Sequence, residues 1–222
     1  MTTMQQATLR GTVYGTLLNH HDALAALGSA VDQPPYKAAP KAPILYIKPR
    51  NTWIAAGQAI VVPAGVPALE MGATLGLVIG RPACRVSEAA ALDFVAGYVI
   101  VNDVSMPHDP YYRPSLRFKA RDSFCPIDRF VACDAVGSPD ALGITVAIDG
   151  KLAQRASTTG LIRSAELLLA EVSDFITLAP GDMLSVGVAA VAPHAQADQQ
   201  VCITIDGLGQ LENPLVSEGG LA

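Results

Sequence analysis

Charged residues gather in one stretch of this chain, residues 102–129. The stretch carries nine charged side chains in a chain that is 16% charged on average, and it holds five of the fifteen Lys and Arg residues. Arg113, Arg117 and Arg121 lie there among tyrosines and a phenylalanine, with apolar sequence on both sides. Cations grouped beside aromatic rings suit a small anion, because guanidinium groups donate paired hydrogen bonds to carboxylates. We therefore predict that these three arginines bind an anionic substrate.

Two residues of the same stretch are candidates for the chemistry itself. Asp103 follows an apolar run, 97–101, and Asn102, so a buried strand would end where its carboxylate could meet Mg²⁺ or, equally, cap the next turn. Lys119 stands between Arg117 and Arg121, and the alternation of a β-strand would place these three cations on one face. Such a face is either an anion site or a solvated edge. The apolar residues 124–127 favour the anion site.

Composition limits the classes of function. A pI near 5.3 and a net charge of −5 argue against a nucleic-acid surface, which needs clustered Lys and Arg over a broad face. No basic and apolar leader begins the chain and no apolar run approaches 18 residues, so we predict a soluble, cytoplasmic protein without membrane contact. The four cysteines are widely spaced, as buried reduced thiols would be. No P-loop or G-x-G-x-x-G motif points to nucleotide or redox cofactors.

Short apolar runs separated by Gly and Pro predict a β-rich chain. Asp149-Gly150 and Asp206-Gly207 are typical of hairpin turns. Helices are predicted over 87–96, over 159–175, where apolar residues recur at helical spacing, and more weakly over 21–27. The predicted strands are 9–18, 44–47, 59–62, 73–79, 97–101, 144–148, 183–186 and 200–205.

The chain is expected to form one domain over residues 1–222, since 222 residues can bury one large core. Residues 1–9 are expected to be a flexible N-terminus. Residues 32–43 contain too many prolines for regular structure, so they form a loop or arm, or alternatively a flap over the pocket.

Several long motifs, in order, resemble the fumarylacetoacetate hydrolase family. They are GYVIVNDVS, YYRPSLRFKARDSFCPI, TLAPGDML and IDGLGQLENPLV, and the likeness runs from about Arg10 to the C-terminus. Within the family, IKPRNT and the YYRP segment are most similar to the bifunctional isomerase/decarboxylases of 4-hydroxyphenylacetate (homoprotocatechuate) degradation, in their N-terminal half or the equivalent small subunit. The resemblance implies an α+β fold, a rolled mixed β-sandwich with a few short helices. It also implies Mg²⁺ or Mn²⁺ that stabilises an enolate.

Part of the family's catalytic pattern is matched here. The resemblance implies that Asp103 is a metal ligand and that Lys119 and Asp122, the K-x-x-D element, are catalytic. It also implies that Asn19 and the neighbouring His20 bind substrate.

Other family positions have lost their chemistry. The two glutamates of the E-x-E metal motif fall on Gly72 and Thr74, and the acid/base His and Glu fall on Ala23 and Ala26. Glu70 lies two residues before the first glutamate position, so it would reach a metal only through a bulge or register shift.

Three hypotheses for the function follow. In the first, the chain is an enzyme subunit that isomerises 2-hydroxyhepta-2,4-diene-1,7-dioate or decarboxylates 5-oxopent-3-ene-1,2,5-tricarboxylate, both small anionic substrates. In the second, the chain is a catalytically impaired structural partner of a complete sister subunit. A third hypothesis is a small-anion binding module. A homodimer or a pairing with a sister subunit is expected in either of the first two cases.

Overall fold

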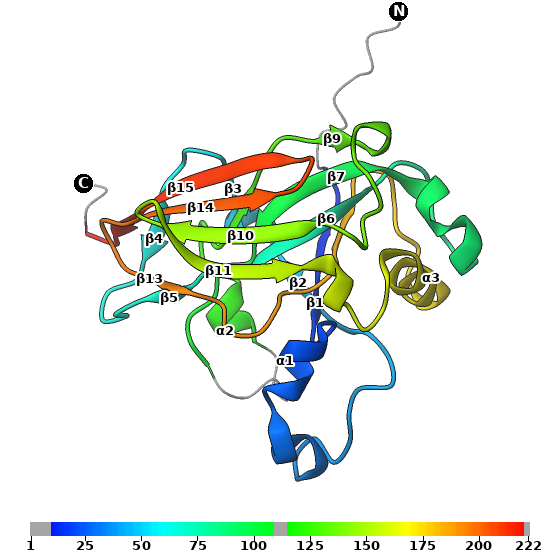
Figure 1. The fold of residues 1–222 in the computed structure, drawn as a ribbon, viewed down its shortest axis with the longest axis horizontal. Coiled ribbons are helices and arrows are strands. Elements are labelled where there is room, and N and C mark those ends of the chain that lie inside the picture. Colours follow the sequence, from blue (N-terminus) through cyan, green and yellow to red (C-terminus); the bar gives the residue numbers. More distant parts are fainter. Residues whose placement is uncertain (1–9, 109–114, 220–222) are drawn as a thin grey trace, which may run out of the picture.

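The computed structural model describes residues 10–108 and 115–219, whose two larger β-sheets are curved, with short helices below and to the right of them in the view of Figure 1. The α+β fold with few helices is thereby confirmed. The predicted flexible N-terminus, 1–9, lies outside the described residues. Within the described part, no helix is long and apolar enough to cross a membrane.

The larger sheet has eight strands and is mixed. Its order is β2 (Ile44–Lys48), β1 (Val13–Leu17), β12 (Met183–Ser185), β6 (Ala73–Ile79), β7 (Val95–Asn102), β8 (Cys125–Ile127) and β3 (Trp53–Ala55), with β9 (Val131–Ala132) also paired to β7. Strands β2 and β3 stand at opposite ends of this order, yet only the 3₁₀ turn η2 (Arg50–Thr52) and Pro49 separate them in sequence. The sheet must therefore curl until its two ends approach each other.

The smaller sheet has five strands. Its order is β11 (Lys151–Ser157), β10 (Gly143–Ile148), β14 (Gln200–Ile205), β15 (Gly209–Ser217) and β4 (Ile60–Val62). Asp149 and Gly150 both have positive φ between β10 and β11, which is the geometry of the tight turn expected there, and Gly207 has positive φ between β14 and β15. A separate two-stranded ladder joins β5 (Leu69–Glu70) to β13 (His194–Ala195).

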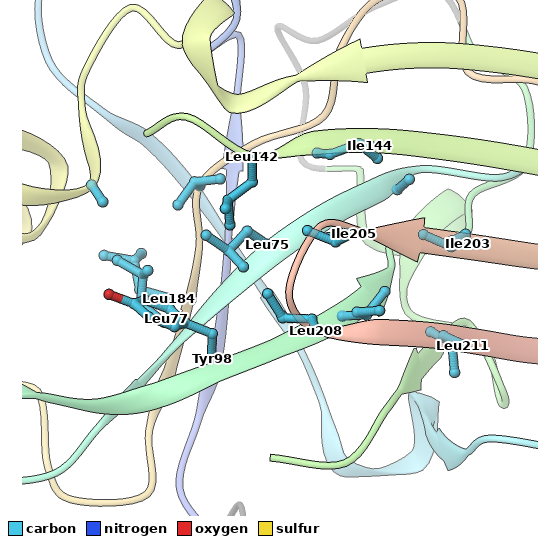
Figure 2. Close-up of a cluster of buried hydrophobic side chains, with 14 of the residues drawn as sticks. Leu75, Leu77, Tyr98, Leu142, Ile144, Leu184, Ile203, Ile205, Leu208 and Leu211 are labelled. Carbon is cyan, nitrogen blue, oxygen red and sulfur yellow. The ribbon is translucent and has the colours of Figure 1, made fainter. Parts of the chain in front are cut away.

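The core lies between the two sheets. Every residue of β6 is buried, as expected of a continuous apolar strand covered on both faces. Figure 2 shows Leu75 of β6 beside Leu142, which directly precedes β10, and Ile205 of β14, and these residues belong to one hydrophobic cluster. This packing fixes the ends of β6 and β7, where the polar site begins.

Helices are short, and α3 (Ala165–Phe175) is the longest described. Ser164 starts α3 by accepting a hydrogen bond from the Leu167 amide, and the buried face of α3 packs on the 3₁₀ helix η3 (Glu88–Phe94). The remaining helical segments are α1 (His21–Ala25), α2 (Leu116–Lys119), η1 (Gly28–Asp32), η4 (Cys133–Ala135) and η5 (Thr158–Gly160).

The structure corrects several predicted elements. The strand expected through 117–121 is the helical turn α2, because Phe118, Lys119 and Ala120 donate backbone hydrogen bonds three or four residues back. The helix expected over 159–175 begins only at 165, and the helix expected over 87–96 is a 3₁₀ helix that gives way to β7 at Val95. In the Pro-rich segment 32–43, Asp32 ends the 3₁₀ helix η1, and residues 33–43 carry no helix or strand, as expected.

Candidate functional site

A cavity of about 230 Å³ opens between α1, α2 and the ends of β5 and β7. Leu17, Leu18 and the small residues of 188–192 make much of its wall apolar. The polar side chains of the described lining are Thr16, Glu70, Asp103, Ser105, His108, Lys119 and His194. A small ligand with a polar end and a hydrocarbon body would fit such a cavity. Residues 32–43 are not among its described lining, so a role for them as a flap stays a prediction.

Asp103 is the most heavily engaged carboxylate in this lining. It follows β7, and its backbone amide donates to the Gly72 carbonyl at 2.8 Å, which continues the ladder between β6 and β7. One carboxylate oxygen lies 2.7 Å from Lys48 Nζ and the other lies 2.8 Å from Lys119 Nζ, with all three side chains at least nine-tenths buried. The Tyr46 hydroxyl donates to the same oxygen that Lys119 contacts.

Lys48 lies behind the cavity and is 2% exposed. Its ammonium donates to the backbone carbonyls of Val104, Lys119 and Phe124 at 2.7, 2.9 and 2.8 Å. The curl of the larger sheet makes this possible, because it brings the end of β2 back to the end of β7. A buried ammonium is tolerated only when its charge is compensated, and Asp103 supplies the compensating charge.

Electrostatics fix the charge states of this group. Burial by itself would raise the pKa of Asp103, but the Lys119 and Lys48 ammoniums outweigh burial and hold that pKa well below its ordinary value. Burial lowers the pKa of Lys48, although Asp103 opposes the change. Burial, and then the Asp103 charge, raise the pKa of Tyr46 well above its ordinary value. Asp103 is therefore an anion and Tyr46 a neutral hydrogen-bond donor.

These residues do not fit a divalent metal. Both Asp103 oxygens already contact ammonium groups, and a Cβ at Gly72 would lie 2.6 Å from the Asp103 carbonyl oxygen, so a longer side chain has no room there. Thr74 Oγ1 donates to the Gly187 carbonyl inside the core. Among the described residues, no group of three or more His, Cys, Asp or Glu side chains could hold a metal ion. The described residues therefore offer no set of ligands that would bind a metal together with Asp103.

Glu70 reaches the cavity by another route than the one expected. Strand β5 pairs with β13, and Glu70 and His194 are direct partners in that ladder. Ser105 Oγ donates to Glu70 Oε2 at 2.8 Å, and His194 Nε2 lies 3.8 Å from Glu70 Oε1. Glu70 thus faces the cavity beside an imidazole, and no bulge toward Asp103 is involved. His108, also in the lining, stacks on Phe118 with ring centroids 4.7 Å apart.

The arginines do not lie where the sequence suggested. Arg117 is exposed on α2, and neither Arg117 nor Arg121 is among the described lining of the cavity, because a helical turn sends them away from Lys119. Asp122 is exposed and accepts a hydrogen bond from Asn51 at 2.7 Å. Arg113 lies outside the described residues. Substrate-binding or catalytic roles for these residues stay predictions.

Asn19 and His20 make structural contacts. The Asn19 amide donates to the carbonyls of Arg163 and Val186 and accepts from the Arg163 amide. His20 caps α1 through the Asp22 amide, and its Nε2 lies 3.2 Å from the Ser157 carbonyl. Neither residue is in the described cavity lining. A substrate-binding role for the pair stays a prediction.

Ala23, Ala26 and Gly72 do line the cavity, as expected from the positions they occupy in the family motifs. Sequence reasoning missed Tyr46, Lys48 and His194. The sequence offered one signal for Lys48, which directly follows the apolar run 44–47. A lysine at the end of a buried strand needs an acidic partner, and Asp103 is that partner. His194 carried no comparable signal.

A family model for the C-terminal region of fumarylacetoacetate hydrolase matches residues 12–216. The 4-hydroxyphenylacetate degradation bifunctional isomerase/decarboxylase of Escherichia coli is 41% identical over 210 residues, covering 95% of this chain and 48% of that protein. Its counterpart in Salmonella dublin is 40% identical, covering 96% and 49%. The chain thus spans about half the length of these curated relatives.

Solved structures agree with this likeness. A 5-carboxymethyl-2-hydroxymuconate delta-isomerase from Mycobacterium smegmatis superposes with a TM-score of 0.82 at 29% identity, covering 96% of this chain and 81% of the other. A fumarylpyruvate hydrolase from Pseudomonas aeruginosa, crystallised with Mn²⁺ and pyruvate, gives a TM-score of 0.81 at 25% identity, covering 94% and 90%.

Proposed function

Because this chain belongs to the fumarylacetoacetate hydrolase family, we propose that it is a subunit of a bifunctional 2-hydroxyhepta-2,4-diene-1,7-dioate isomerase/5-oxopent-3-ene-1,2,5-tricarboxylate decarboxylase of aromatic catabolism. The bacterial isomerase/decarboxylases, about half of whose length the chain matches, support this assignment. A cytoplasmic location and a pairing with a second copy or a sister subunit are part of the same proposal.

Lys119 carries the proposal. It is the described Lys or Arg side chain that lines the cavity, and its ion pair with Asp103 keeps the ammonium in place. An ammonium on a side chain that is only 8% exposed can bind a substrate carboxylate and stabilise negative charge that develops on a keto oxygen. Tyr46 supports it from behind, since Lys119 Nζ lies 4.9 Å from the centre of the Tyr46 ring. Asp103 thus acts as a positioning residue for Lys119.

The apolar wall suits the rest of such a substrate. Ala23 in the middle of α1 and Ala26 directly after it present only methyl groups, and the 188–192 segment adds small aliphatic side chains. An unsaturated hydrocarbon chain between two carboxylates could lie along this wall and lose little by leaving water.

A divalent metal would act as a Lewis acid on the keto oxygen, and the relative crystallised with Mn²⁺ supports such use elsewhere in the family. The residues around Asp103 do not fit that group, so any metal-dependent step is assigned to a sister subunit. This assignment favours the second candidate, a structural partner that has kept a carboxylate-binding cavity. The observation in its favour is that Gly72 and Thr74 occupy the positions where the family motif has its two metal-binding glutamates.

Binding of 2-oxopentanedioate, a stable 2-oxo dicarboxylate, tests the proposed role of Lys119. We expect Lys119→Met to weaken binding measured by calorimetry at least about tenfold, since a charge-assisted hydrogen bond contributes roughly 1.5–3 kcal/mol. Lys151→Met, at an exposed position of β11, is the matched control and should bind as the wild type does. Equal binding by the Lys119 variant and the wild type would exclude the cavity as a carboxylate site.

Turnover separates the two candidates. If the isolated chain isomerises or decarboxylates the pathway substrates, it is an enzyme by itself. If turnover appears only after a sister subunit is added, the chain is the partner. Both measurements are made with and without added Mg²⁺.

A further inference from the structure

Glu70 and His194 form a second polar group in the cavity, apart from Asp103 and its lysines. The β5–β13 ladder sets them side by side, with Glu70 Oε1 3.8 Å from His194 Nε2. Ser105 holds the other oxygen of Glu70 at 2.8 Å. The Glu70 side chain is 28% exposed and that of His194 is 54% exposed, so the pair connects the cavity with solvent.

We infer that Glu70 and His194 are a catalytic proton-transfer pair, which moves a proton at the carbon next to the keto group of a bound 2-oxo acid while Lys119 faces the keto oxygen. This inference rests on the proposed function, since it takes the same cavity and the same class of substrate. It gives the chain a metal-independent keto–enol step of its own, although positions 23 and 26 lack acid or base groups.

The step conserves atoms and electrons. The Glu70 carboxylate takes a proton from C3 of the 2-oxo acid, and the C–H electron pair becomes the C2=C3 double bond. The former C=O π pair moves to the oxygen, and the Lys119 ammonium stabilises the resulting enolate. Return of the proton from Glu70 to C3 regenerates the keto acid. Return to a more distant carbon of a conjugated chain shifts the double bond, which is an isomerisation.

The contacts give each member a distinct part. Because Ser105 donates to Oε2, Oε1 is the oxygen turned toward His194 and open for proton transfer. Carboxylates and imidazoles are the side chains that most often transfer protons in enzymes. More than half of the His194 side chain is exposed, so it can exchange the proton on Glu70 with water.

Hydrogen–deuterium exchange at C3 of 2-oxopentanedioate tests the inference. The full chain is incubated with the acid in D₂O containing EDTA, and loss of the C3 proton signal is followed by NMR. We expect exchange well above the buffer rate for the wild type and a loss of roughly 100-fold or more for Glu70→Gln. Glu212→Gln, at an exposed position of β15, is the matched control and should exchange as the wild type does.

His194→Gln should slow the exchange by a smaller factor, about tenfold, because Glu70 can still take the proton but passes it to solvent slowly. Thermal melts of each variant show whether it has folded, and Ser105→Ala provides a second, milder change to the same carboxylate. It should lower exchange without weakening binding of the acid.

The outcomes are distinguishable. A folded Glu70→Gln variant that binds 2-oxopentanedioate and exchanges within about threefold of the wild type overturns the inference and leaves the proposed function standing. Exchange that EDTA abolishes in the wild type also overturns it. Failure of the wild type to bind the acid at all removes the proposed function and the inference together.

Discussion

Replacing Asp103 with asparagine is the sharpest test of the site's electrostatics. The side chain keeps its shape but loses the charge that compensates Lys48 and Lys119, which lie 2.7 and 2.8 Å away. Removing one partner of a buried ion pair typically costs about 3–5 kcal/mol, because the other charge is left uncompensated. The lower end applies here, since Lys48 keeps three carbonyl acceptors and its pKa is already lowered by burial.

We therefore expect Asp103→Asn to lower the free energy of unfolding by about 3 kcal/mol, or the melting temperature by roughly 6–12 °C in a chain of this size. Urea unfolding followed by the fluorescence of Trp53, the single tryptophan, gives the number directly. Asp93→Asn is the control, because its ion pair with Arg81 at 3.7 Å is largely exposed and should contribute no more than about 1 kcal/mol.

Acid should remove the difference between Asp103→Asn and the wild type. The folded-state pKa of Asp103 lies below its ordinary value of 3.8, so its stabilisation is complete above that value and is lost as pH falls through the folded-state pKa. The gap in stability should thus be full at pH 7 and shrink below about pH 4. A variant within about 1 kcal/mol of the wild type at pH 7 would refute the assignment of Asp103 as the buried counter-ion.

Three further changes test other parts of the structure. Gly72→Glu should destabilise the fold by about 1–3 kcal/mol and still bind no Mn²⁺ by calorimetry, because its Cβ meets the Asp103 carbonyl oxygen at 2.6 Å. Burial, and then the Glu166 carboxyl, raise the pKa of Asp140 to about 6. The folded protein therefore loses stability as pH rises through that value and Asp140 becomes charged. The melting temperature of Asp140→Asn should therefore be higher than that of the wild type at pH 8 and equal to it at pH 4. Equal melting temperatures at pH 8 would contradict this expectation. Leu168→Ala, in the fully buried face of α3, should cost about 2–5 kcal/mol in urea unfolding.

Local signals predicted the fold well where one residue's neighbours decide its conformation. Strand β6 was predicted over 73–79 and β14 over 200–205, the ranges found, because both are apolar runs bounded by turn residues. The prediction of a strand through 117–121 was wrong, because this segment includes the helical turn α2. Alternating charge looks the same in an exposed strand and in a single helical turn, and the backbone hydrogen bonds of α2 decide between them.

The sequence by itself determined that Asp103 and Lys119 belong to one site and that positions 72 and 74 carry no carboxylate. Only the tertiary structure decided what surrounds them. The curl of the larger sheet brings Tyr46 and Lys48 to Asp103, and the β5–β13 ladder brings His194 to Glu70 from more than a hundred residues away. Such contacts depend on strand order and register, which short-range sequence patterns do not encode.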